Sequence, residues 1–267
     1  MQINGKRVLL TGATGGLGRA IAIAIADRGG ELVLSSRKRE ELEKLAQELS
    51  GEKHSIAVCD LAEPGAAERL AGETGPIDVL VANAGLPGTG LIEDFSTKEI
   101  ERAIRVNLET PMVLSQAFVP AMKAGGGGHL VFVSSLSGKV ASPRASIYNA
   151  TKFGLRGFAL GLRQDQIIDG TGIGVSLVLP GFIRGAGMFA EGGAELPPGA
   201  GTGTPEQVGQ AVVKAITDDR AEIAVAPAHM RAISGFGHVF PGIAARTQRG
   251  AGKKVADQLA RGNAEKR

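Results

Sequence analysis

Short apolar runs alternate along the chain with longer stretches of helical periodicity. Helix-like stretches cover 17–28, 38–50, 97–123, 146–168 and 205–218, and seven apolar or β-branched runs recur, namely "RVLLTG", "ELVLSS", "SIAVCD", "DVLVANAG", "HLVFVSS", "GVSLVLP" and "EIAVAP". Such alternation predicts a parallel sheet with helices on both faces, and strands without a polar side fit that burial. We therefore expect an α/β fold with a doubly wound, mainly parallel, seven-stranded sheet. Its ligand site should lie at the C-terminal ends of the strands.

The last apolar run ends near Pro227, and the composition changes there. Residues 227–267 hold eight Lys/Arg and two Asp/Glu, whereas the rest of the chain holds 22 and 25. We interpret residues 1–227 as a single nucleotide-binding domain of the Rossmann type and 228–267 as a basic C-terminal extension. The basic character belongs to the extension, so the net charge does not indicate that the body binds nucleic acid.

The extension has an apolar stripe whose function the sequence leaves open. It could pack over the substrate site or a subunit interface, or it could be an amphipathic surface helix that touches an anionic membrane or a partner. Gly235, Gly237 and Pro241 count against one long helix. The stripe, at helical spacing, consists of Met230, Ile233, Phe236, Phe240 and Ile243.

The bulk composition, 43% hydrophobic and 21% charged, is that of a soluble globular protein. No apolar run reaches the roughly 18 residues of a membrane span. The N-terminus enters an apolar strand at once, which leaves no room for a signal peptide. Cys59 is the only cysteine, so an internal disulfide is impossible. We expect a cytoplasmic protein with no integral membrane segment.

The first strand runs into a glycine-rich turn, "LLTGATGGLGRAIA". Gly12, Gly16 and Gly18 allow the backbone to turn tightly and approach a pyrophosphate, which the following helix N-terminus would attract. The second strand ends in "SSRKREE": Ser35 and Ser36 precede Arg37, and no acid follows before Glu40. Because an arginine there accommodates a ribose 2′-phosphate, the pattern favours NADP(H) over NAD(H). The alternative for Arg37 is a solvated basic helix start.

The only tyrosine, Tyr148, stands four residues before Lys152 in "YNATK". Residues i and i+4 share a helix face, so the ammonium can lie beside the phenol. We expect this charge to lower the pKa of the phenol, as an oxidised nicotinamide would. The phenol could then exchange a proton with an alcohol or ketone while hydride moves. The alternative is a core tyrosine with a satisfied hydroxyl.

Four motifs occur in order: TGxxxGxG, "NAG", a serine 13 residues before YxxxK, and "PG". From about residue 5 to 226 the chain therefore resembles the single-domain short-chain dehydrogenases/reductases. The resemblance implies a catalytic set of Asn107, Ser135, Tyr148 and Lys152, with Asn107 kinking the long fourth helix and anchoring a relay water. The implied cofactor-binding residues are Gly12, Thr14, Gly16, Leu17, Gly18, Ser36, Arg37, Asp60, Leu61, Asn83, Ala84, Gly85, Tyr148, Lys152, Pro180, Gly181 and Ile183.

The chain departs from this pattern at one position. Where the family often has a threonine that bonds the nicotinamide carboxamide, this chain has Gly185. Gly185 also opens the Gly/Pro-rich stretch 185–204, which is too long for an ordinary connection. That stretch is either a disordered surface loop or a mobile lid over the substrate.

Together these features predict an NADP(H)-dependent oxidoreductase that interconverts a secondary alcohol and a ketone. The alternative is a catalytically weak cofactor-sensing or scaffold protein of the same fold, with a tail that contacts membrane or a partner.

We expect a homodimer or homotetramer that pairs through 97–123 and 146–168, as in the family. We expect no metal, since the four histidines lack ligand spacing, and His129 should lie at the wrong end of the sheet. A hydrophobic substrate is suggested by Leu86, Leu136, Val140, Phe182, Met188 and Phe189.

Overall fold

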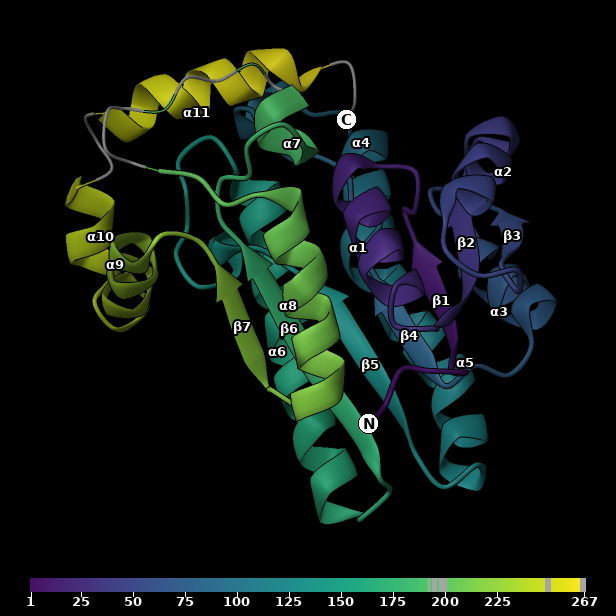
Figure 1. Ribbon diagram of the computed structural model, residues 1–267. Coiled ribbons are helices and arrows are strands. Elements are labelled where there is room, and N and C mark those ends of the chain that lie inside the picture. The colour runs from purple at the N-terminus through teal and green to yellow at the C-terminus, as the bar shows by residue number, and fades with distance from the viewer. Residues whose placement is uncertain (192, 194–195, 197–200, 248–250, 265–267) are drawn as a thin grey trace.

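The computed structural model describes residues 1–267 except 192, 194–195, 197–200, 248–250 and 265–267. In this part of the chain, seven strands form one sheet in the order β3-β2-β1-β4-β5-β6-β7, and every neighbouring pair is parallel (Figure 1). This confirms the predicted doubly wound α/β fold. The strands are β1 (Arg7–Thr11), β2 (Glu31–Ser36), β3 (Ser55–Val58), β4 (Val79–Ala82), β5 (Gly128–Val133), β6 (Ile173–Pro180) and β7 (Glu222–Val225).

Helices cover both faces of the sheet, because alternate strand residues point to opposite sides. Val8 and Leu10 of β1 pack with α1 (Gly16–Ala26), α2 (Arg39–Glu48) and α8 (Pro205–Asp218). Leu9, between them, packs with α3 (Ala66–Thr74), α5 (Thr110–Ala124) and α6 (Ser146–Ile168). Each central strand is therefore apolar on both sides, as its unbroken apolar sequence requires.

The strand order reverses direction between β1 and β4. From β1 the chain adds β2 and β3 on one side, and β4 to β7 then follow on the other. The loops after β1 and β4 consequently diverge at the C-terminal edge of the sheet. Ligands of doubly wound folds bind at such a reversal, so this edge is where the predicted site residues should gather.

The predicted long helix 97–123 is in fact interrupted. It consists of α4 (Thr97–Ile104), a π-helical turn at Arg105–Glu109 and α5. Ser96 and Glu99 form a capping box at the start of α4. Asn107 lies inside the π turn, where the resemblance placed a kink. The other predicted helices agree with the structure to within two residues at each end.

Five further α-helices of the described residues lie where the periodicity gave no prediction or a weak one, and α3 is the first of them. The short α7 (Gly187–Glu191) starts the Gly/Pro-rich stretch, whose residues 192, 194–195 and 197–200 lie outside the described residues. The extension forms α9 (Ala228–Val239), α10 (Pro241–Thr247) and α11 (Ala251–Gly262), with the expected break at Pro241. Among the described residues, no helix combines the length and apolar character needed to cross a membrane.

The apolar stripe of the extension is partly exposed to solvent. Ile233, Phe236, Phe240 and Ile243 are each 46–61% exposed, so they do not belong to the packed interior of the described chain. The small residues of the extension face the protein instead. A Cβ at Gly237 would lie 2.9 Å from a methyl of Val140, so α9 approaches the body too closely for a larger residue.

A matched pair of helix glycines tests the packing of α1 on α8. A Cβ at Gly209 would lie 2.6 Å from the carbonyl oxygen of Ala20 and 3.0 Å from Cβ of Ala24. Gly209→Ala should therefore lower the free energy of unfolding by about 1–3 kcal/mol in urea titrations. Gly161→Ala, in α6 with nothing within 4 Å, should raise it by about 0.5–1 kcal/mol. Equal effects of the two changes would contradict this packing.

Candidate active site

The turn between β1 and α1 can hold a pyrophosphate. Gly12 has φ +65°, and a Cβ there would lie 2.9 Å from Cα of Ala84. A Cβ at Gly18 would collide with the carbonyl oxygen of Gly12, and one at Gly16 would lie 2.5 Å from Cβ of Ala186. The three glycines thus keep the turn free of side chains beside the first N–H groups of α1, as an anion site needs.

Asn83 fastens this turn to the end of β4. Its Nδ2 donates to the carbonyl oxygens of Thr11 and Gly12, both at 3.1 Å. The backbone N–H groups of Asn83 and Ala84 both donate to Oγ1 of Thr11, also at 3.1 Å. The "NAG" segment is therefore locked against the glycine turn at the strand reversal, which is the supporting position that the resemblance implied.

The end of β2 offers polar groups that the protein itself does not use. The Oγ atoms of Ser35 and Ser36 are buried without a hydrogen-bond partner. Arg37 is exposed and makes no ion pair with any residue that the structure describes. By contrast, Lys38 reaches Glu41 at 2.6 Å and Arg39 pairs with a glutamate one turn on. Buried orphan hydroxyls are rare, so these groups fit a bound adenosine ribose and its phosphate.

Asp60 and Leu61 follow β3 at the same edge. The half-buried Asp60 accepts a hydrogen bond from the backbone N–H of Ala62 at 3.0 Å, which shapes the turn. Leu61 is buried in the core beside it. The structure thus places both residues next to the end of β2, since the N–H of Cys59 donates to the carbonyl oxygen of Ser36 at 2.9 Å.

Tyr148 and Lys152 lie on one face of α6, as their spacing predicts. The Nζ atom of Lys152 is 5.6 Å from the centroid of the Tyr148 ring and donates to the carbonyl oxygen of Val133 at 3.2 Å. Lys152 is 3% exposed, and burial lowers its pKa to about 8. At neutral pH this amine still carries its proton, so the site holds a buried positive charge beside the phenol.

The pKa of Tyr148 runs against the sequence-based expectation. Burial raises it to about 12, and the hydrogen bond of Ser135 opposes this rise only in part. For the chain alone, the expectation that Lys152 lowers this pKa below its ordinary value is therefore wrong. Burial removes the phenolate from water, and this disfavours the charged form by more than the hydrogen bond of Ser135 favours it.

Asn107 connects the segment after β4 to the helix of Tyr148. Its buried Oδ1 accepts from the N–H of Leu86 at 2.7 Å, and its Nδ2 donates to the carbonyl oxygen of Leu86 at 2.9 Å. Nδ2 also donates to Oγ1 of Thr151 at 3.3 Å, and that hydroxyl donates to the carbonyl oxygen of Tyr148 at 2.9 Å. The π turn brings the amide to this place, and the amide in turn fixes the position of Tyr148.

Ser135 and the residues after β6 complete the edge. Ser135 Oγ donates to the carbonyl oxygen of Pro180 at 3.4 Å, and the N–H of Gly181 donates to that of Val225 at 3.0 Å. Ile183 is buried and bridges to Gly203, which closes the base of the Gly/Pro-rich stretch. These contacts bring the predicted nicotinamide-lining residues next to Ser135.

The departure at Gly185 has a conformational reason. Gly185 has φ +76°, in the left-handed region that a threonine adopts only under strain. The bend directs α7 back over the glycine turn, where Ala186 meets Gly16 and Leu17 lies beside Gly187. From α7, the terminal methyl of Met188 reaches to 3.5 Å from the position of a Cβ at Gly85.

The C-terminal helix contributes contacts that sequence reasoning missed. In Figure 1, α11 lies across the end of the molecule above α7. Nδ2 of the buried Asn263 donates to the carbonyl oxygen of Met188 at 3.3 Å, and Asp257 pairs with Arg144 at 2.9 Å. Thr89 Oγ1 donates to the carbonyl oxygen of Leu259 at 3.3 Å. These are single polar contacts between distant residues, for which no sequence pattern exists.

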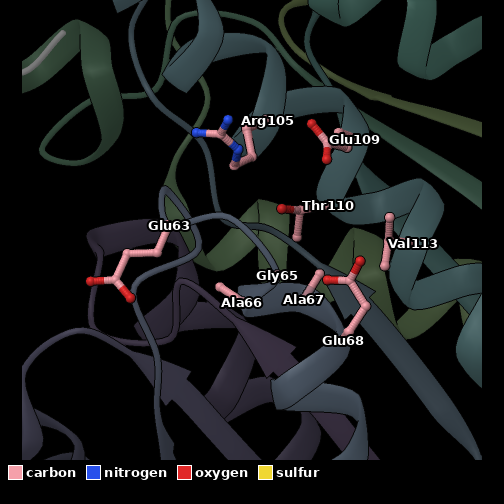
Figure 2. A pocket seen from close by; sticks show the side chains of 9 residues that line it. All are labelled: Glu63, Gly65, Ala66, Ala67, Glu68, Arg105, Glu109, Thr110 and Val113. Atoms are coloured by element: carbon pink, nitrogen blue, oxygen red, sulfur yellow. The ribbon is translucent and has the colours of Figure 1, made fainter. Parts of the chain in front are cut away.

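Two other features lie outside the set of predicted site residues. A hollow of about 10 Å³ lies between α3 and the π turn. Figure 2 labels the residues that line it, such as Glu63, Glu68 and Arg105. None of the predicted site residues lines it.

His129 is buried at the N-terminal end of β5, opposite the edge that holds the candidate site. It forms a hydrogen bond with Ser176 at 2.9 Å, and burial lowers its pKa to about 4. The expectation that His129 takes no part in catalysis agrees with this position.

Comparison with known proteins identifies the family. A family model described as short chain dehydrogenase matches residues 6–196. This chain belongs to the short-chain dehydrogenase family. It is 35% identical over 229 residues to the ketoacyl reductase HetN of Nostoc, covering 84% of this chain and 79% of that protein. It is 35% identical over 197 residues to an uncharacterized oxidoreductase of Thermotoga maritima, and the match covers 71% of this chain and 76% of that protein.

A solved structure supports the same assignment. A short-chain alcohol dehydrogenase of Sinorhizobium meliloti has a TM-score of 0.71 and 25% identity, with 84% of this chain and 95% of that chain covered. The chain is therefore an oxidoreductase of the dehydrogenase/reductase type, in a family that uses NAD or NADP.

The lone tyrosine makes the pKa at this site directly measurable. With a pKa of about 12, only about one-tenth of Tyr148 should be ionised near pH 11, against about nine-tenths of an ordinary tyrosine. Phenolate absorbance in the near ultraviolet reports this fraction without interference, because the chain has no tryptophan. Tyr148→Phe is the blank. Nearly complete ionisation at that pH in the folded protein would contradict the effect of burial.

Proposed function

We propose that this short-chain dehydrogenase interconverts a secondary alcohol and a ketone with NADP(H), and that its substrate is hydrophobic. The observation that carries the proposal is the convergence of Ser135, Tyr148 and Lys152 beside the glycine turn. The turn, Asn83 and the orphan hydroxyls of Ser35 and Ser36 support a dinucleotide at this edge. On this proposal, residues 1–227 are the catalytic domain, 228–267 are an extension of it, and the protein acts in the cytoplasm.

NADPH, when bound, supplies the hydride for the ketone carbon. Tyr148 donates its phenolic proton to the carbonyl oxygen, and in the oxidising direction it takes the proton of the alcohol. Ser135 donates a hydrogen bond to the same oxygen as negative charge develops there. The buried ammonium of Lys152 stabilises the phenolate that the proton transfer leaves behind. Asn107 holds the helix of Tyr148 in place through Thr151 and Leu86.

Arg37 supports NADP(H) over NAD(H). An exposed guanidinium without a carboxylate partner can form two parallel hydrogen bonds with a phosphate. The adjacent Ser36 hydroxyl is buried and has no partner of its own, so it is a second donor to the same group. An acid that would bond a ribose 2′-hydroxyl is missing from the end of β2 in the sequence.

The apolar residues near the site favour a hydrophobic substrate. The half-buried rings of Phe182 and Phe189 pack with their centroids 4.9 Å apart, on the segment that leads into α7. Leu136 lies one residue after Ser135 and packs against the core. The name of the Nostoc relative, a ketoacyl reductase, agrees with reduction of a ketone.

Two-fold pairing through α4, α5 and α6 is part of the proposal. Short-chain dehydrogenases are often oligomeric, and α4 packs against α6 on one face of the sheet. Phe153 and Ile104 expose 39% and 42% of their side chains on these helices. A homodimer, or a homotetramer of such dimers, would cover them.

The first test of the mechanism is Tyr148→Phe. The ring remains and only the proton is lost, so ketone reduction should fall by about 10²–10⁴-fold while NADPH affinity stays within about twofold. Turnover is followed by NADPH absorbance over a panel of ketones, and binding by NADPH fluorescence. Full activity in this variant would show that another group supplies the proton.

Cofactor choice is tested at Arg37. Arg37→Ala should weaken NADPH binding by about 1.5–3 kcal/mol and leave NADH binding nearly unchanged, since NADH lacks the 2′-phosphate. Arg39→Ala, a neighbouring arginine already paired with Glu43, is the matched control and should change neither affinity. The proposal fails if the wild-type protein binds NADH as tightly as NADPH.

Sedimentation tests the pairing. The wild-type protein should sediment as a dimer or tetramer at micromolar concentration, and Phe153→Glu should shift it toward monomer because the charge would be buried in the contact. Ile23→Glu changes a similarly exposed position on α1, across the sheet, and should leave the oligomeric state unchanged. A wild-type monomer, or an oligomer that Phe153→Glu leaves intact, counts against pairing through these helices.

A further inference from the structure

The two helices α9 and α10 present a compact apolar surface to solvent. Five of the thirteen large apolar side chains exposed in the described part of the chain lie within eleven residues here. Two of them, Phe236 and Phe240, stack with ring centroids 4.8 Å apart. We call this surface the α9–α10 patch; it consists of Ile233 (61% exposed), Phe236 (51%), Val239 (65%), Phe240 (48%) and Ile243 (46%).

The patch faces away from the body of the protein. Figure 1 shows α9 and α10 beyond β7, at the end of the sheet. The residues of these helices that face inward are small: Ser234, Gly237 and Ala244 are buried, and Gly237 lies close to both Ala244 and Val140. The inward contact is therefore already complete, and the large side chains cannot join it by a small rotation of the helices.

The described charged side chains of α9 and α10 have one sign. Between Glu222 and Asp257 the sequence has five Lys/Arg and no Asp or Glu. In the structure Arg231 and Arg246 are exposed on the same two helices as the patch. An outward apolar face on short, broken helices whose charges are basic is the pattern of a segment that lies in the interface of an anionic bilayer.

We propose that the α9–α10 patch docks this protein on the surface of an anionic lipid bilayer. The aromatic and aliphatic side chains would enter the acyl boundary, while Arg231 and Arg246 contact lipid phosphates. A second copy of the chain fits less well. A two-fold contact joins the same patch of both copies, so it would bring the arginines of each copy toward those of the other without an acid between them.

The docking is peripheral and does not depend on the catalytic proposal. The patch belongs to the extension, whereas Ser135, Tyr148 and Lys152 belong to the body. Vesicle binding therefore measures the function of the patch alone, and turnover measures the function of the active site alone. A protein that lacks reductase activity could still dock, and a protein that does not dock could still reduce a ketone.

The test uses the full-length protein and sedimentation with vesicles of phosphatidylcholine, with and without phosphatidylglycerol. Binding should require the anionic lipid and should weaken as salt shortens the range of the charges. Phe236→Ser with Phe240→Ser should weaken binding about tenfold or more. Arg231→Glu with Arg246→Glu should do the same. Both pairs are exposed, and circular dichroism verifies that each variant is folded.

The control is Ile167→Ser with Ile168→Ser, two exposed side chains at the C-terminal end of α6. They precede the start of β6, at the N-terminal edge of the strands, whereas α9 follows the C-terminal end of β7. This pair should leave vesicle binding unchanged. Absence of binding to anionic vesicles would overturn the proposal, as would binding that neither patch variant weakens. Self-association without lipid that the Phe236→Ser, Phe240→Ser pair abolishes would assign the patch to a second copy instead.

Discussion

A buried ammonium beside a single phenol is the constraint on which the site depends. Lys152 is 3% exposed, and a cation in such a place costs several kcal/mol unless polar groups surround it. The carbonyl oxygen of Val133 accepts one of its protons, at 3.2 Å. A Cβ at Gly138 would lie 2.7 Å from the carbonyl oxygen of Lys152, so the loop after β5 packs directly on this helix turn. Small changes in that loop would move the charge.

The position of the phenol also depends on the π turn that interrupts a helix at Asn107. A continuous helix from 97 to 123 would make hydrogen bonds only within its own backbone. The π turn instead directs the Asn107 amide toward Leu86 and Thr151. The loop after β4 and the helix of Tyr148 are thereby joined through one buried side chain. The position of the phenol relative to the cofactor edge then depends on a polar network rather than on apolar packing, which has no directional preference.

Local patterns in the sequence were enough to predict the sheet and the center of the site. The seven strands, α6 and α8 follow from apolar runs and helical periodicity, and the i, i+4 spacing alone places Lys152 beside Tyr148. The direction of the Tyr148 pKa could not be predicted in this way, because it depends on how deeply the fold buries the hydroxyl. The contacts of α11 with Arg144 and Met188 join residues far apart in the chain, and no periodicity encodes them. The apolar stripe of the extension was visible in the sequence, but its direction was not, because the small residues beside Val140 decide which side faces the body.

The central claim is the proposal that the charge of Lys152 makes Tyr148 a usable acid and base despite its burial. The most direct measurement is the pH dependence of kcat/KM for alcohol oxidation in the wild type and in Lys152→Met. The account predicts that the loss of the charge moves the pH at which activity rises upward by about one unit or more. A lower rate with an unchanged pH profile would contradict it.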